Sequence, residues 1–184
     1  MKLHNTTHLA DGELSARFGR YTAGWDTDDL EVFVRPSRGA DFSGTCRYDR
    51  DRIYVNVGRR VRYPYRMGTN LARARSNARH WWKPTYVIEL ADAYQLALFV
   101  FLHELYHWLI HRAGRNIRQK ESMCDRFAAR ALVDDWHAPI SDGQKRPVPR
   151  TLWDFQDLDR FVVAARADRL PAVPPARKTP RLRK

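Results

Sequence analysis

Cysteine is scarce in this chain of 184 residues, which contains only Cys46 and Cys124. Two cysteines cannot build a disulfide framework, so the class of disulfide-stapled secreted domains is excluded and a reducing compartment is expected. The first residues lack the apolar stretch of a signal peptide, which predicts a cytoplasmic protein. The most apolar window, residues 93–110, is interrupted by a glutamate and two histidines. It therefore predicts a buried helix rather than a membrane span, and we expect no membrane partner.

Acidic residues are also in deficit, because 21 Asp and Glu face 33 Lys and Arg, which gives a net charge of +12. The hydrophobic share of 43% still supports a folded core. The positive surplus is concentrated in residues 59–83, which hold eight basic residues and no acid, and in residues 169–184, which hold six basic residues and four prolines. We expect one domain over residues 1–167, with a basic insertion at 59–83, followed by a disordered tail at 168–184.

The basic insertion is a candidate surface for nucleic acid. Its basic residues are Arg59, Arg60, Arg62, Arg66, Arg73, Arg75, Arg79 and Lys83. Tyr63, Tyr65, Trp81 and Trp82 lie among them. Cationic side chains neutralise phosphates and aromatic rings stack on bases, so nucleic acid is a candidate partner. The alternative interpretation is a solvated loop whose tryptophans close the core.

Hydrophobic periodicity predicts an α+β domain. Alternating apolar residues indicate strands, and a spacing of three and four indicates helices. The expected strands are Leu30–Arg35, Gly44–Tyr48, Arg52–Val57 and Pro84–Leu90, of which the second and third form a hairpin. The expected helices are a short one near residues 12–18, then 93–111, 119–134 and 152–167. Strands followed by helices are typical of α+β folds rather than of doubly wound α/β folds.

The stretch His103-Glu104-Leu105-Tyr106-His107 is an HExxH motif. Residues four apart lie on one face of a helix, so two imidazoles can reach one metal ion while Glu104 lies beside them. The alternative is a pair of core histidines satisfied by hydrogen bonds. Two histidines and a glutamate are costly to bury in an apolar helix unless a partner binds them, which favours a metal site.

A catalytic zinc ion takes a third protein ligand and keeps its fourth position open. His111 is a poor candidate, because it lies about 12 Å from His103 along the helix axis. Glu121 is favoured, with Asp125 four residues later on the same helix face as acceptor for the free N–H of a ligand histidine. Cys124 is a weaker alternative, because thiolates are more typical of structural zinc sites.

HELYHWLIH followed by ESMCDRFAARAL resembles the gluzincin branch of the zincin metallopeptidases, and most closely the ImmA/IrrE-like family. The resemblance implies a zincin-like α+β fold, in which a small mixed or antiparallel sheet packs on the HExxH helix and a second ligand-bearing helix. It also implies one zinc ion on His103, His107 and Glu121, and hydrolysis of peptide bonds in a protein or peptide substrate with Glu104 as the general base.

A weaker resemblance links residues 43–56 to the strand pair of SprT-like proteases, whose third ligand is a histidine, for which only His137 follows here. Either family implies an edge strand beside the metal cleft, which we expect at 52–57 or 84–90. The donor for the oxyanion stays open between Tyr106, His137 and an arginine of 112–118. The alternative function is a nucleic-acid-binding module with a catalytically idle zincin-like fold. The oligomeric state is left open.

Overall fold

The computed structural model describes residues 1–115 and 121–167, and it has the predicted α+β class. A four-stranded sheet has the order β1-β2-β4-β3, in which β1, β2 and β4 run parallel and β3 runs antiparallel to β4. The strands are β1 (Lys2–Asn5), β2 (Glu31–Pro36), β3 (Phe42–Arg47) and β4 (Arg52–Val57). The predictions of a strand near 30–35 and of a hairpin across residues 49–51 are confirmed, whereas β1 was not predicted.

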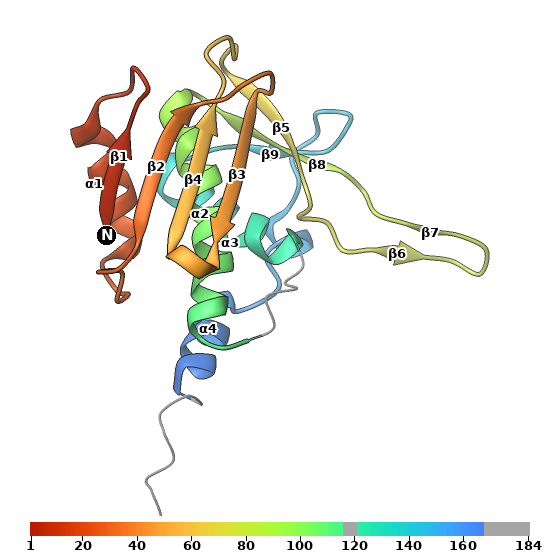
Figure 1. Cartoon of the computed structure of the whole chain (residues 1–184). Coiled ribbons are helices and arrows are strands. Elements are labelled where there is room, and N and C mark those ends of the chain that lie inside the picture. Colours follow the sequence, from red (N-terminus) through yellow and green to blue (C-terminus); the bar gives the residue numbers. More distant parts are fainter. Residues whose placement is uncertain (116–120, 168–184) are drawn as a thin grey trace, which may run out of the picture.

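The strands form because their apolar residues alternate. On β2 and β4 the side chains of Val32, Val34, Ile53 and Val55 are fully buried, and Val32 pairs with Ile53 while Val34 pairs with Val55. This buried face packs against the long helix α2 (Ala93–Arg112), which lies behind the sheet in Figure 1.

Helix α2 is the centre of the core, and its prediction is confirmed. Asp92 caps its first turn by accepting the Gln95 N–H at 2.7 Å. Helix α1 (Asp11–Thr22) covers one side through Phe18, which stacks on Phe101 at 4.1 Å. Helix α3 (Glu121–Trp136) packs along another side. Among the helices of the described residues, none has the length and apolarity needed to cross a membrane.

The last helix is shorter than predicted. Helix α4 spans Leu158–Ala167, whereas periodicity predicted a start at 152. The Asp157 carboxylate caps the helix by accepting the Arg160 N–H at 3.0 Å. Before it, residues 150–152 form a 3-10 turn, and Arg150 is bound to Asp134 and Asp154. Leu152 therefore belongs to this turn and Phe155 to the segment between the turn and α4, so neither is part of the helix.

Residues 59–83 are more than an insertion, because they supply β5 to a second, antiparallel sheet of order β5-β8-β9. Its strands are β5 (Tyr65–Thr69), β8 (Tyr86–Leu90) and β9 (Ile140–Ser141). Between β5 and β8 the chain forms a two-stranded hairpin of β6 (Arg75–Ser76) and β7 (Trp81–Trp82), which projects from the body in Figure 1. The tail predicted at 168–184 lies outside the described residues.

The expectation of a free edge strand at 52–57 or 84–90 is wrong. β4 lies between β2 and β3, and β8 lies between β5 and β9, so both have neighbours on each side. The sheet edges that approach the HExxH helix are β3 and β5, which line one pocket with it. β3 was recognised only as half of a hairpin, because its sequence gives no sign of which strand ends the sheet.

The β3–β4 connection offers a test of how the sheet is fixed to α2. The buried Trp108 indole donates its N–H to Asp51 at 2.8 Å, and Asp51 has a left-handed backbone with φ of 48°. We expect Asp51→Ala to lower the free energy of unfolding by about 1–3 kcal/mol, because it leaves the indole N–H unpaired. Asp51→Asn keeps an acceptor and should lose much less. Chemical denaturation measures both, and exposed Asp49→Ala is the matched control, expected to behave like wild type.

Candidate metal centre

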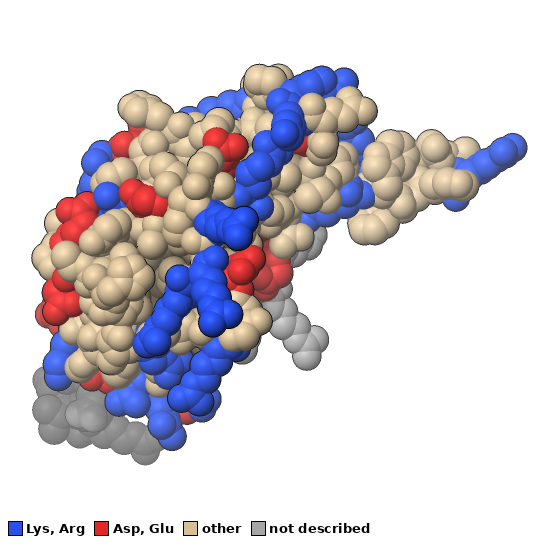
Figure 2. All heavy atoms as spheres, turned by 90° about the horizontal axis from the view of Figure 1, so that it is seen from above, with Lys and Arg blue, Asp and Glu red and all other residues tan. Residues whose placement is uncertain are grey.

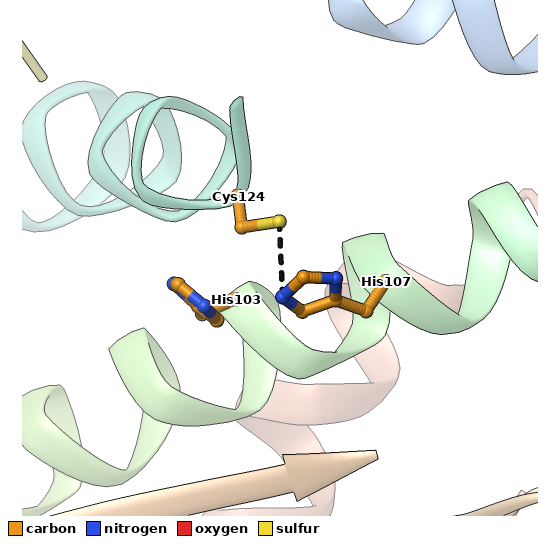
Figure 3. Close-up of side chains that lie close together, drawn as sticks. All are labelled: His103, His107 and Cys124. Carbon is orange, nitrogen blue, oxygen red and sulfur yellow. Dashed lines mark hydrogen bonds between the residues drawn. The ribbon is translucent and has the colours of Figure 1, made fainter. Parts of the chain in front are cut away.

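His103 and His107 lie one turn apart on α2 and point toward α3 (Figure 3). Their ring centroids are 5.2 Å apart, and their side chains are only 15% and 12% exposed. The rest of this helix is nearly all apolar and buried. The two imidazoles are therefore the polar part of a buried helix, and they need partners from a neighbouring element.

Glu121, the first residue of α3, meets both imidazoles. Its Oε2 lies 3.0 Å from His103 Nε2, and its Oε1 lies 3.5 Å from His107 Nε2. The hydrogen bond from His103 lowers the pKa of Glu121. The carboxylate is thus ionised and bridges the two ring nitrogens that face the same space, as the i, i+4 spacing on α2 requires.

Cys124 is one turn further along α3 and also reaches the histidines. Its Sγ lies 3.3 Å from His107 Nε2, as Figure 3 shows, and it is fully buried. One ligand atom from each of His103, His107 and Cys124 lies within 4.8 Å of the others, so this group could hold a metal ion. Burial raises the pKa of the Cys124 thiol above its usual range, so the thiol keeps its proton until a cation displaces it.

Asp125 fixes the orientation of His103. Its Oδ1 lies 2.7 Å from His103 Nδ1, and its Oδ2 accepts the backbone N–H of Asn70 at 2.5 Å. This contact leaves Nε2 of His103 directed at Glu121. Burial lowers the pKa of His103, but the hydrogen bonds to Asp125 and Glu121 outweigh it and raise the pKa to about 9. Metal binding at neutral pH therefore has to release this proton.

Glu104 lies against the backbone of β3, where its carboxylate is hydrogen-bonded to the Cys46 backbone, and it lines the same pocket as His103. A Cβ at Gly44 would lie 2.8 Å from Glu104 Cγ and 2.9 Å from its Cδ, so only glycine leaves room for the carboxylate. Burial, the largest influence, raises the pKa of Glu104 to about 7, with His103 lowering it and Glu121 raising it. A carboxylate with a pKa near neutrality can take up and release a proton at working pH.

One pocket of about 230 Å³ is lined by Glu104, by Glu121 and Asp125 of α3, and by the edge strands β3 and β5. Its lining residues are Phe42, Gly44, Met67, Gly68, Asn70, Phe99, Val100, His103, Glu104, Glu121 and Asp125. The Gly58 N–H donates to the Asp41 C=O, so these two residues face each other as a hydrogen-bonded pair. In an antiparallel ladder every second pair is hydrogen-bonded, so the pairs formed by Phe42, Gly44 and Cys46 with β4 are not. The backbone N–H and C=O groups of these three residues therefore point away from β4. Of these groups, the Gly44 C=O accepts the Thr45 hydroxyl at 2.6 Å and the Cys46 backbone is hydrogen-bonded to Glu104, so the edge of β3 that faces the pocket is partly occupied.

Three other residues considered for the site lie elsewhere. Tyr106 packs on Phe127 with ring centroids 5.1 Å apart, and its hydroxyl is buried without a hydrogen-bond partner among the described residues. His111 stacks on Tyr48 at 4.7 Å, further along α2. His137 follows the end of α3, about 20 Å from the level of Cys124 along the axis.

The described arginines of 112–118 are also engaged away from the histidines. The Arg112 guanidinium lies 3.8 Å from Asp29, and that of Arg115 lies 5.0 Å over the Phe161 ring. Arg118 lies outside the described residues. No oxyanion donor proposed from the sequence therefore reaches the pocket in the described part of the chain.

Sequence reasoning missed Gly44 and Asn70. A glycine inside a strand often marks a close approach of another group, so Gly44 did carry a signal. Asn70 carried none, because it acts through its backbone N–H. Of the predicted nucleic-acid-binding residues, Arg66 faces Glu89 at 3.8 Å and Arg73 lies 3.6 Å over the Phe155 ring, whereas Arg75 and Arg79 lie on the β6–β7 hairpin.

Two substitutions separate the candidate third ligands. We expect Glu121→Gln to weaken zinc binding by more than about a hundredfold, beyond the effect typical of groups that only orient a ligand. Cys124→Ser should bind zinc with affinity close to wild type, because Glu121 already meets both imidazoles. Competition titration with a chromophoric chelator measures both affinities. Tight binding by Glu121→Gln together with loss in Cys124→Ser would instead show a centre of two histidines and one cysteine.

Comparisons with protein-family models, with curated proteins and with solved structures find no match to this chain. The geometry of His103, His107, Glu121, Cys124, Asp125 and Glu104 is therefore what the assignment of a function depends on.

Proposed function

We propose that the protein is a zinc-dependent metallopeptidase with a zincin-like architecture, in which His103, His107 and Glu121 hold one zinc ion. The observation that carries the proposal is the position of Glu121, whose two carboxylate oxygens lie 3.0 and 3.5 Å from the Nε2 atoms of the two histidines. Two imidazoles and a carboxylate at one point are the donor set of hydrolytic zinc sites. Without a cation, only hydrogen bonds through ring protons hold the imidazoles of His103 and His107 near the Glu121 carboxylate.

Glu121 suits a hydrolytic site better than Cys124 does. It is already ionised, its side chain is 60% exposed, and it lies at the open side of the pocket. Cys124 is fully buried, and burial raises the pKa of its thiol. A carboxylate at the rim leaves room for water and substrate, whereas a buried thiolate is typical of closed structural sites.

Glu104 is the general base of the proposed reaction. A bound zinc ion supplies a Lewis acid, which acidifies a water molecule and polarises a carbonyl group. Glu104 accepts the proton of the attacking water on a carboxylate oxygen and delivers it to the leaving amine. Its pKa of about 7 fits both steps, and Gly44 leaves the space in which the carboxylate sits. Asp125 keeps the His103 Nδ1–H engaged, so that Nε2 stays available.

The substrate is an extended segment of a protein or peptide. The N–H and C=O of Phe42 and the N–H of Gly44 face away from β4 at the pocket, so a peptide can add to β3 there as a further strand. Such a strand would run past Glu104 and the histidines, which line the same pocket. A cytoplasmic location fits this proposal, since both Cys46 and Cys124 are free thiols.

Removal of the base tests the reaction. We expect Glu104→Gln to keep zinc and the fold but to lower peptide hydrolysis by roughly 10²–10⁴-fold, the usual contribution of general base catalysis. Cleavage of an unstructured protein such as casein, with zinc content measured on the same samples, provides the readout. Glu89→Gln, on the surface of β8, is the matched control. Equal hydrolysis by wild type and Glu104→Gln would refute the mechanism.

A methyl group on β3 tests the position of Glu104. We expect Gly44→Ala to reduce kcat by roughly a hundredfold with zinc retained, because the new Cβ displaces the carboxylate and small misplacements of catalytic groups are costly. Gly68→Ala in the same pocket is the control, since its Cβ would meet nothing closer than 3.5 Å. If Gly44→Ala keeps full kcat, Glu104 does not act from the place where the structure has it.

A further inference from the structure

The hairpin of β6 and β7, residues 73–83, is the most prominent feature that the peptidase proposal leaves unused; we call it the arm. Figure 2 shows it extending from the body, with uncharged side chains along its length and basic ones at its end. Its tip is ordered by Asn77, whose side chain accepts the N–H groups of Arg79 at 2.9 Å and His80 at 2.7 Å. The arm is therefore a defined turn rather than a loose loop.

The arm exposes two large aromatic side chains, contrary to the alternative that the tryptophans close the core. Trp81 is 70% exposed and Trp82 is 43% exposed. The other large hydrophobic side chains exposed in the described residues, Leu152 and Val163, belong to other elements, the 3-10 turn at 150–152 and α4. Two adjacent indoles in water on a projecting hairpin mark a binding surface, since the core gains nothing from them.

The charge of the arm has one sign. It holds Arg73, Arg75, Arg79 and Lys83 and no acidic residue. The Arg73 guanidinium lies 3.6 Å over the Phe155 ring at the root of the arm, whereas Arg75 and Arg79 are exposed further out. Guanidinium groups bind phosphate oxygens through paired hydrogen bonds, so the outer arm suits a polyanion.

The register of the hairpin decides between a polyanionic strand and a lipid surface. Arg75 is paired with Trp82, and Ser76 is paired with Trp81, so the two indoles lie on opposite faces of the ribbon. A membrane-binding element collects its apolar residues on one face, which this ribbon does not do. A flexible strand with separate bases and phosphates can contact both faces, with a base on each indole.

We propose that the arm binds single-stranded nucleic acid, with Trp81 and Trp82 stacking on unpaired bases and with Arg75 and Arg79 neutralising phosphates. Unpaired bases are required, because the faces of bases inside a duplex are already stacked. The arm leaves the body beside the candidate metal centre, since Asn70, just before it, donates its N–H to Asp125. A protein associated with the bound strand is then held near the cleft. The binding itself requires neither metal nor hydrolysis.

Fluorescence anisotropy of a labelled oligothymidylate, titrated with the full chain, tests the proposal. We expect the double substitution Trp81→Ala with Trp82→Ala to weaken binding at least tenfold, since stacking on one aromatic side chain already contributes several-fold or more. Circular dichroism and the thermal midpoint should be unchanged, because both indoles are exposed. Arg75→Ser with Arg79→Ser should reduce the slope of log affinity against log salt by about 1.4, which corresponds to two phosphates of a single strand.

Arg50→Ser with Arg160→Ser is the matched control, because it removes two exposed charges away from the arm and should leave the salt slope close to wild type. Undiminished binding by the tryptophan variant would overturn the proposal. So would a duplex of equal length that binds as tightly and with the same dependence on the tryptophans. Vesicles containing phosphatidylserine provide a third measurement. If the tryptophan variant loses vesicle binding but keeps oligothymidylate binding, the surface is a lipid anchor and the proposal fails.

Discussion

His103, His107 and Asp125 are largely buried between α2 and α3, Glu121 meets both imidazoles from the exposed side, and the packing of these helices has to pair the four groups. Charged groups removed from water cost several kcal/mol each unless they find partners. Here His103 contacts Asp125 at 2.7 Å and Glu121 at 3.0 Å. Sliding α3 by one turn would leave an imidazole or a carboxylate unpaired. Apolar burial by residues such as Ala128 and Leu132 stabilises the contact between the helices, while the ionic pairs fix its register.

Local patterns explain why much of the fold could be predicted. The hairpin of β3 and β4 follows from alternation on both sides of a polar turn, and α2 and α3 follow from long apolar periodicity. β5 could not be found in this way, because it lies in an arginine-rich segment and its pairing is distant: Tyr65 lies opposite Leu90. The edge position of β3 could not be predicted either, because strand order is decided by tertiary contacts and not by the residues of the strand.

The site could be predicted further than the fold around it, because helix spacing places side chains directly. Residues four apart brought His103 and His107 together, and the same rule placed Glu121 and Asp125 on one face of α3. This rule could not decide whether Glu121 or Cys124 is the third metal ligand, because residues three apart lie on the same face of α3 as well. The choice depends on the rotation of α3 and on proton affinity: the hydrogen bond from His103 lowers the pKa of Glu121, whereas burial raises the pKa of Cys124.

The arm and the candidate metal centre are held by the same turn of α3. After β5 the chain gives the N–H of Asn70 to Asp125, and three residues later Arg73 lies over the Phe155 ring. The guanidinium of Arg126, the neighbour of Asp125 in sequence, lies over the same ring at 4.1 Å. Asp125 orients His103, so the contacts that root the arm also fix the acceptor that positions a metal-facing imidazole. The root of the arm therefore lies next to the cleft, because one turn of α3 anchors both.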